Sequence, residues 1–330
     1  MPRKRQRPHV GSRYRAIVVP LDGSRLGEQA LPLALAIAER SSAKLRLVLV
    51  SIPVVPPTAM LPLSAEVRQL YNSLDVEARQ FEWAYLKSVA DQLRKQSPSV
   101  VITSRTLTGP VADALLEYVR QSRSDLVVMT TRGHGGLRRL WLGSVADAVI
   151  RGSSAPVFLV RPEENAPPQP VLENLSQILV PLDGSALSET ILRPAATLAA
   201  LGQAELMLVQ VIQPLSSPLE GQRAAPSTFD VELTQVRRRE AADYLKDLAE
   251  KCLEAGVTAG YATPLGGNVA DTILGLAESS TVGLIAIATH GRSGVKRLAI
   301  GSVADKLVRT APRSLLVYRP PVRTKGRARS

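Results

Sequence analysis

Two glycine-rich segments of this 330-residue chain end in a Gly-Ser pair and are its best candidates for binding phosphate. The first segment ends in Gly143-Ser144 and the second in Gly301-Ser302. Glycine allows a tight turn and a close backbone approach to a ligand. Each pair also stands where a helix is expected to begin. A helix N-terminus offers free N–H groups and a partial positive charge, which stabilise bound phosphate.

The same serines fit an explanation that needs no ligand. Ser144 and Ser302 each stand three residues before an aspartate, as in the S-x-x-[DE] capping pattern, so they are also predicted helix caps. Both explanations stay open at this point. Two other phosphate motifs are excluded, because the chain has no G-x-x-x-x-G-K-[ST] and no G-x-G-x-x-G after its first predicted strand.

The elements that position these pairs occur twice. Ile17–Ser24 (IVVPLDGS) returns as Ile178–Ser185 (ILVPLDGS), and Leu142–Asp147 (LGSVAD) returns as Ile300–Asp305 (IGSVAD). A repeat of about 145 residues is the size of a domain and too long for a solenoid unit. We therefore predict a basic tail, two domains joined by a proline-rich linker, and a second basic tail, at residues 1–13, 14–162, 163–174, 175–320 and 321–330.

Short apolar runs alternate with helical patterns in each repeat, which predicts an α/β fold with two tandem five-stranded parallel-type sheets and helices on both faces. The first half has predicted strands at 16–20, 45–50, 100–107, 125–130 and 157–160 and helices at 26–40, 74–96, 111–121 and from 145. The second half has strands at 178–181, 206–211, 261–265, 284–288 and 315–318. In such sheets ligands bind beyond the carboxyl ends of the strands.

The glycine loops resemble those of tandem universal stress proteins, whose nucleotide-binding members carry G-x2-G-x9-G-[ST] after the fourth strand. Gly133 with Gly143-Ser144, and Gly291 with Gly301-Ser302, match the second glycine, the spacer and the final pair. The first glycine is replaced by Thr130 in one half and by Ala288 in the other. Because threonine adds a β-branched side chain where the backbone should approach ribose, we expect the second half to be the better site.

The resemblance implies further contacts. The acid after the first strand, Asp22 or Asp183, would contact the nucleoside, and the backbone of Val50 or Val211 would contact adenine. Asp-Gly-Ser is also ordinary turn chemistry, and a valine at the end of a core strand also packs, so these alternatives stay open. Arg292 is added to the predicted nucleotide-binding residues, with a solvated surface charge as its alternative explanation. Proline-rich segments near 53–64 and 214–227 are expected to be mobile loops beside the sites.

The function that the resemblance implies is a regulatory stress-response protein that binds ATP, with Mg2+. A slow ATP hydrolase and a nucleotide-free scaffold are the alternatives. We assign no catalytic residue, because no Ser/His/Asp or Cys/His arrangement is recognisable, and no metal site, because the single cysteine and three histidines form no ligand cluster. The resemblance also implies pairing of the two domains through their last strands, while a homodimer and an unidentified regulatory partner stay open.

The net charge of +12 is concentrated at the two ends of the chain. Residues 1–15 contribute +6 and residues 319–330 contribute +5, which leaves +1 for the whole of 16–318. Such tails can hold anions non-specifically or can be simply solvated. No apolar run approaches the ~20 residues of a membrane span, and we expect a cytoplasmic protein.

Overall fold

The computed structural model describes residues 13–53, 64–131, 142–161, 172, 175–214, 228–278, 281–289 and 301–320. Strands alternate with helices throughout, as the sequence predicts. The elements of the first half are β1 (Ala16–Leu21), α1 (Arg25–Glu28), α2 (Leu31–Ser41), β2 (Lys44–Ser51), α3 (Ala65–Gln96), β3 (Ile102–Thr108), α4 (Val111–Gln121), β4 (Leu126–Thr130), α5 (Ser144–Gly152) and β5 (Val157–Val160).

The second half repeats this order, with a short 3-10 helix in place of α1. Its elements are β6 (Gln177–Pro181), η1 (Ser188–Ile191), α6 (Leu192–Gly202), β7 (Glu205–Val209), α7 (Thr228–Glu254), β8 (Ala259–Ala262), α8 (Val269–Ala277), β9 (Val282–Ala288), α9 (Ser302–Thr310) and β10 (Ser314–Tyr318).

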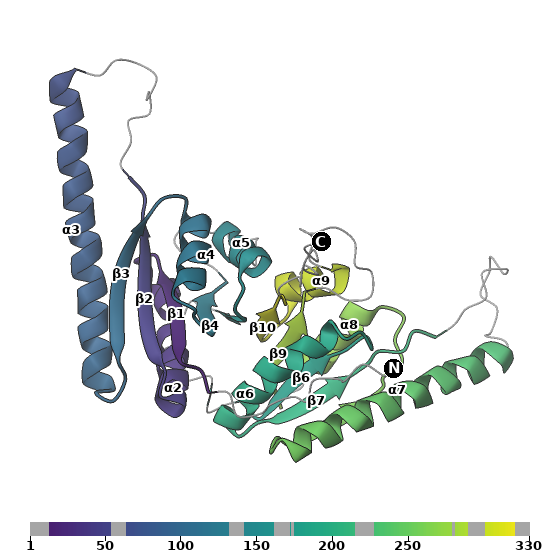
Figure 1. The fold of residues 1–330 in the computed structure, drawn as a ribbon. Coiled ribbons are helices and arrows are strands. Elements are labelled where there is room, and N and C mark those ends of the chain that lie inside the picture. The colour runs from purple at the N-terminus through teal and green to yellow at the C-terminus, as the bar shows by residue number, and fades with distance from the viewer. Residues whose placement is uncertain are drawn as a thin grey trace, which may run out of the picture.

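The strands form one continuous ten-stranded sheet in the order β3-β2-β1-β4-β5-β10-β9-β6-β7-β8 (Figure 1). All pairs within a half are parallel, whereas β5 and β10 pair antiparallel, with Phe158 opposite Leu316. The predicted α/β class with parallel sheets is thus confirmed, and so is the predicted pairing of the halves through their last strands. The seam makes the two sheets a single layer.

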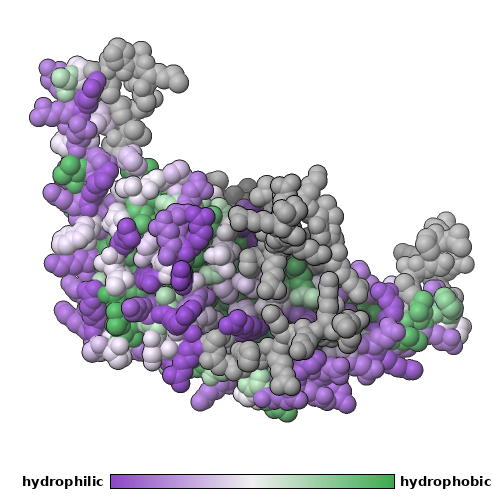
Figure 2. Space-filling view, viewed as in Figure 1, coloured by the Kyte–Doolittle hydropathy of each residue, from purple (hydrophilic) through white to green (hydrophobic). Residues whose placement is uncertain are grey.

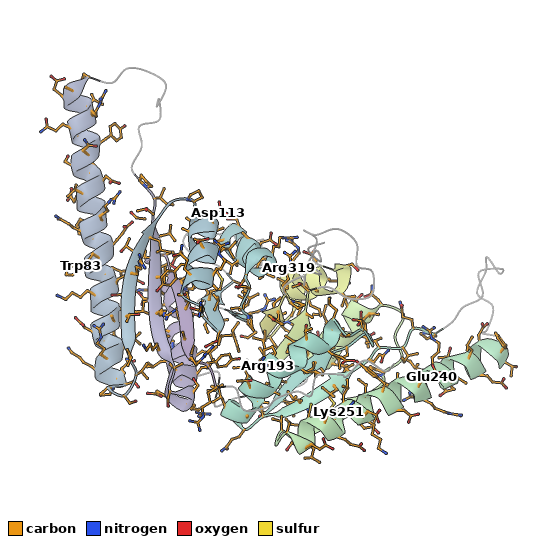
Figure 3. The ribbon with its side chains drawn as sticks, in the orientation of Figure 1. Trp83, Asp113, Arg193, Glu240, Lys251 and Arg319 are labelled. Atoms are coloured by element: carbon orange, nitrogen blue, oxygen red, sulfur yellow. The ribbon has the colours of Figure 1, made fainter. Side chains whose placement is uncertain are left out.

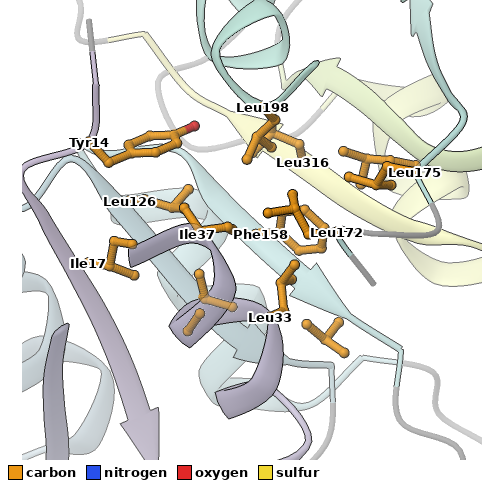
Figure 4. Packing of buried hydrophobic residues seen from close by; sticks show 14 of the residues in the cluster. Tyr14, Ile17, Leu33, Ile37, Leu126, Phe158, Leu172, Leu175, Leu198 and Leu316 are labelled. Atoms are coloured by element: carbon orange, nitrogen blue, oxygen red, sulfur yellow. The ribbon is translucent and has the colours of Figure 1, made fainter. Parts of the chain in front are cut away.

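Helices cover both faces of this layer, and each face has one apolar core that crosses the seam. Buried side chains of α2, α3, α6 and α7 form the first cluster, and those of α4, α5, α8 and α9 form the second. Figure 4 shows Phe158 of β5 packed in the first cluster near Leu33 of the first half and Leu172 and Leu175 near the start of the second. Leu172, the described residue of the predicted linker, is fully buried. The halves therefore share their core.

Four expected elements differ most from the structure, and one of them is β8, which spans Ala259–Ala262 instead of 261–265. The predicted helix at 26–40 is divided into α1 and α2, and Pro32, which has no N–H to donate, stands in the first turn of α2. Helix α3 begins well before the predicted start, because the Ser64 side chain accepts a hydrogen bond from Val67 N (3.3 Å) and caps it. Strand β7 ends at Val209; just beyond it Gln210 N still donates to Ala262 O, but Pro264 has no N–H to donate in return.

Helix α3 projects past the sheet (Figure 1). Its buried side chains are confined to the C-terminal third, at Leu86, Val89, Ala90 and Leu93. The projecting part is mostly hydrophilic with scattered hydrophobic side chains (Figure 2). Trp83, which Figure 3 shows farther along α3 beside the sheet, is 60% exposed. Among the described residues, no helix combines the length and the apolar character that crossing a bilayer requires.

Candidate functional site

Central strand β1 brings the predicted residues of the first half to one end of the sheet. Leu21, the last residue of β1, pairs with Leu49, so Asp22 and Val50 lie side by side at this end. Val18 pairs with Val127, and the same register puts Asp22 level with Thr131, directly after β4. Strands β2 and β4 flank β1, so the connections leave β1 in opposite directions here, as at the ligand-binding crevice of doubly wound sheets.

The second half builds the same row around β6. Pro181 pairs with Val209 and Leu179 with Ile285, which puts Asp183 level with Val211 and Thr289. Because β5 and β10 run in opposite directions, the carboxyl ends of the strands in the two halves point in opposite directions, and the two rows lie at opposite ends of the strands. The structure thus brings together the predicted residues of each half and separates one candidate site from the other.

The aspartate in each row holds a turn. In the first half, Asp22 Oδ1 accepts hydrogen bonds from Ser24 N (3.0 Å) and Ser24 Oγ (2.6 Å), and Ser24 Oγ accepts one from Gly27 N (2.9 Å). In the second half, Asp183 Oδ1 accepts from Ser185 N and Oγ at 3.0 and 2.6 Å. The turn explanation is therefore confirmed for both aspartates. Asp22 is exposed and Asp183 partly exposed.

The Gly-Ser pairs begin helices α5 and α9. Gly143 N donates to Thr131 O (2.8 Å) and Gly301 N to Thr289 O (2.7 Å), which fixes each helix start against the end of β4 or β9. The N-cap residues are the glycines, and neither helix has a side-chain cap hydrogen bond. The capping prediction for Ser144 and Ser302 is wrong, because the serines stand one residue too late, at the first helical position.

The structure gives no internal reason for glycine at these two caps. The φ angles of Gly143 and Gly301 are −75° and −59°, which any residue adopts. A Cβ built at either position would lie 3.4 Å from the neighbouring threonine carbonyl oxygen, an ordinary contact. The serines that follow are exposed. Glycine is a common N-cap residue, and at both caps it also leaves the backbone open to close approach by a ligand.

A tyrosine–glutamate pair that sequence reasoning missed supports each aspartate turn. Tyr85 of α3 donates to Glu28 Oε1 (2.9 Å), and Tyr244 of α7 donates to Glu189 Oε1 (3.1 Å). Burial, the hydrogen bond to Glu28 and the negative charges of Glu28 and Asp22 all raise the pKa of Tyr85, so its hydroxyl stays protonated as a donor. The signal was present in the repeat, because Glu28 and Glu189 stand at equivalent positions of the two halves, as the aspartates do.

The remaining predicted residues are packed or lie outside the described chain. Val50 and Val211 are partly buried and pack against the second apolar cluster, so the packing explanation holds for both side chains. Gly133, Gly291 and Arg292 lie outside the described residues, as do the basic tails apart from Arg13 and most of the two proline-rich segments. Cys252 is buried in α7, and burial raises the pKa of its thiol to about 11, which fits packing.

The described ranges contain no group of three or more His, Cys, Asp or Glu side chains arranged to hold a metal ion. Each row instead offers backbone N–H groups at a helix start, a serine hydroxyl and a carboxylate turn. This combination can hold the phosphates of a ligand at the helix end, with its neutral part near the aspartate turn.

Comparison with known proteins gives consistent matches. The model of the universal stress protein family matches residues 13–161 and 174–319. A universal stress protein of Mycobacterium tuberculosis is 26% identical over 322 residues, covering 92% of this chain and 95% of the relative. One of Methanocaldococcus jannaschii is 33% identical over 149 residues, covering 45% of this chain and 82% of the relative. The crystal structure of a universal stress protein from Archaeoglobus fulgidus has a TM-score of 0.66 at 17% identity, covering 93% of this chain and 98% of that one.

Proposed function

The chain belongs to the universal stress protein family, and on that premise we propose that it is a regulatory protein that binds ATP at two sites. The phosphates lie at Gly143-Ser144 in the first half and at Gly301-Ser302 in the second. Asp22 and Asp183 face the nucleoside, and the backbone of Val50 and Val211 lies beside the adenine. Gly133, Gly291 and Arg292 complete the loops. Under this proposal, residues 14–162 and 175–320 are two nucleotide-binding domains.

The observation that carries the proposal is the Gly-Ser start of α5 and α9. Both helices begin without a side-chain cap, with exposed serines and with glycines that the described chain does not itself require. Free N–H groups, the helix dipole and a hydroxyl therefore meet at one point, which suits an anion. Two copies of this arrangement, one in each half, support a binding role over an accident of packing.

Magnesium would arrive with the nucleotide. Mg2+ is usually held by substrate phosphates, water and one or two carboxylates. Asp22 and Asp183 are the carboxylates of the two rows, although Oδ1 of each already accepts two hydrogen bonds in its turn. The ion's contribution would be to neutralise phosphate charge, and the chain's own contribution is the backbone and hydroxyl donors.

The test is isothermal titration of the purified chain with ATP and magnesium. We expect two sites in the intact chain and one in each of the variants Gly143→Val and Gly301→Val, because a branched side chain blocks backbone approach. The double variant should bind no ATP. Circular dichroism of each variant checks that the fold is retained. Phosphate release from the intact chain measures whether ATP is hydrolysed.

Two results would count against the proposal. If the intact chain binds no ATP at millimolar concentration, the protein is a scaffold without nucleotide. If ATP binds and the folded double variant still binds it equally well, the site lies elsewhere on the molecule. Recovery of a nucleotide from natively purified and then denatured protein would support the proposal independently.

A further inference from the structure

Each helix that starts at a candidate site is held at its other end by an arginine from the opposite half. Arg161 follows β5 and donates through Nη2 to Val308 O of α9 (3.1 Å) and through Nε to Arg313 O (3.1 Å). Arg319 follows β10 and donates through Nη1 to Arg151 O of α5. Arg319 lies where the two halves meet (Figure 3). The two arginines stand at equivalent positions of the repeat, so the arrangement is reciprocal.

The carbonyl groups that accept these bonds are ones that a helix leaves without partners. Val308 and Arg151 both stand among the last four residues of their helices, whose C=O groups have no intrahelical donor. A guanidinium there satisfies a carbonyl and also interacts favourably with the negative end of the helix dipole. The arginines therefore hold the C-terminal ends of α9 and α5.

Each arginine is also connected to the candidate site of its own half. Val160, which precedes Arg161, accepts from Thr131 N (3.1 Å), and Thr131 O accepts from Gly143 N (2.8 Å). In the second half, Tyr318 accepts from Thr289 N (3.1 Å), and Thr289 O accepts from Gly301 N (2.7 Å). Together these contacts form a closed ring. The first site is connected through Arg161 to α9, which begins at the second site, and the second site is connected through Arg319 to α5, which begins at the first.

Ion pairs add a second connection between the same helices. Arg151 contacts Asp147 of its own helix (2.8 Å) and Asp305 of α9 (3.8 Å), while Arg309 contacts Asp305 (3.0 Å) and Asp147 of α5 (3.9 Å). These side chains are 30–45% exposed, so each pair is weak. They hold α5 and α9 side by side, whereas the arginine–carbonyl bonds set the position of each helix end.

We infer that Arg161 and Arg319 are positioning residues for the nucleotide site of the opposite half and that they couple the two sites. This inference rests on the proposed function. A nucleotide at one helix start fixes that helix, and the ring transmits this to the end of the neighbouring strand and to the other Gly-Ser pair. The first ligand would then meet part of the ordering cost of the second, which predicts positive cooperativity when the intact chain is titrated with ATP and its loss in Arg161→Gln and Arg319→Gln.

The experiment measures affinity across the seam. In the Gly301→Val background, where the first site alone is left, Arg319→Gln should weaken ATP binding at that site about five- to tenfold, within the usual range of coupling between sites. In the Gly143→Val background, Arg161→Gln should weaken the second site similarly. Arg319→Lys and Arg161→Lys should restore part of the affinity, since lysine keeps a charged donor. Arg79→Gln, on an exposed ion pair of α3, is the matched control and should change neither site.

Each outcome decides the inference. If the intact chain binds ATP but Arg319→Gln leaves the first site within twofold of its affinity, the inference is wrong and the proposed function stands, even where thermal stability falls. If the glutamine and lysine variants lose affinity equally, the arginines have only a packing role and the inference is also wrong. If the intact chain binds no ATP, the proposed function fails and the inference fails with it.

Discussion

The turn after the first strand is built in the same way in both halves, although one residue beside it differs. In the first half the position is held by Gly27, where a Cβ would lie 2.6 Å from Asp22 Oδ1 and would force the carboxylate to shift. The second half has Ser188 at the equivalent position, and the segment forms 3-10 helix η1 where the first half forms α1. Ser188 Oγ donates to Ser185 O (2.9 Å). The aspartate–serine hydrogen bonds persist while the following helix changes type, so the turn is the more constrained feature.

A second difference lies at the end of the fourth strand of each half. Thr130 ends β4 and is 7% exposed, whereas Ala288 ends β9 and is partly exposed. The Gly-Ser helix starts beyond them match closely, down to the hydrogen bond between the glycine and the threonine carbonyl. The halves therefore share the part that would hold phosphate and differ where ribose is expected. We expect different affinities at the two sites.

Truncating a core side chain at the seam between β5 and β10 should have the largest effect. It tests whether the two halves unfold separately or together. Phe158→Ala removes a fully buried ring from the shared core and should cost about 3–5 kcal/mol of unfolding free energy. Leu316→Ala, on the opposing strand, should cost about 2–5 kcal/mol. Urea unfolding followed by hydrogen exchange should show both halves losing protection together. If only the half that carries the substitution is destabilised, the core is not shared energetically.

Removing the site serines should have the next largest effect and separates binding from folding. Under the proposed function, Ser302→Ala and Ser144→Ala would each remove a hydrogen bond to charged phosphate, at a cost of about 1.5–3 kcal/mol of binding free energy. Because neither serine caps its helix, the unfolding free energy should change by less than about 0.5 kcal/mol. Titration with ATP and thermal unfolding without it measure the two quantities. A loss of stability with unchanged affinity would restore the capping explanation.

Exchanging glycine and serine at the position beside the aspartate turn tests how much crowding each half tolerates there. Gly27→Ser puts a side chain against the Asp22 carboxylate and should cost about 1–3 kcal/mol of stability through overpacking. The reverse change, Ser188→Gly, also removes the hydrogen bond from Ser188 Oγ to Ser185 O, so it should cost about 1–2.5 kcal/mol, of which about 0.5–1 kcal/mol is backbone entropy. Thermal unfolding of both variants measures the two costs. A Gly27→Ser variant as stable as the unchanged chain would show that the first half tolerates a side chain at this position.

The smallest expected effect is a gain in stability in the second half. Gly275 lies inside α8, has open space around its Cα and stands at the position that Glu117 occupies in α4. Gly275→Ala should stabilise by about 0.4–1 kcal/mol, because alanine restricts the unfolded chain. Gly23→Ala is the opposite control, since Gly23 has φ +79° and should destabilise. Calorimetry of the pair checks both signs.

The repeated motifs were enough to predict the parallel sheets and to propose the two candidate sites, whereas the seam was predicted from the family resemblance. Parallel strands bring their carboxyl ends to one edge, so Asp22 and the Gly143 loop had to meet whatever the details of the loops. Fine positions were harder to predict. The pattern S-x-x-D predicts Ser144 as the N-cap, but the N-cap is Gly143, one residue earlier. The pattern gives no information about capping by the glycine.

Other features depend on contacts that no local pattern encodes. The first turns of α3 are exposed, so apolar periodicity is weak there and Ser64 was the only local signal of the true start. Arg161 and Arg319 each follow a strand, and the carbonyl groups that they bind lie in the opposite half of the chain. Their equivalent positions after the last strand of each half were the available signal. Repeats therefore indicate which polar residues to compare between halves, even where periodicity gives no information.

The seam also has a consequence for synthesis of the protein. Phe158 and Leu316, which pair across it, stand a whole repeat apart in the chain. At about 5–20 residues per second, β10 is made roughly 8–32 s after β5. During that interval the first half can already fold, while Val157–Val160 still lacks its neighbour and presents an apolar strand edge to other nascent chains. The duration of this exposure is set by the ribosome's speed through the second half, so we expect slow codons there to favour aggregation of the first half.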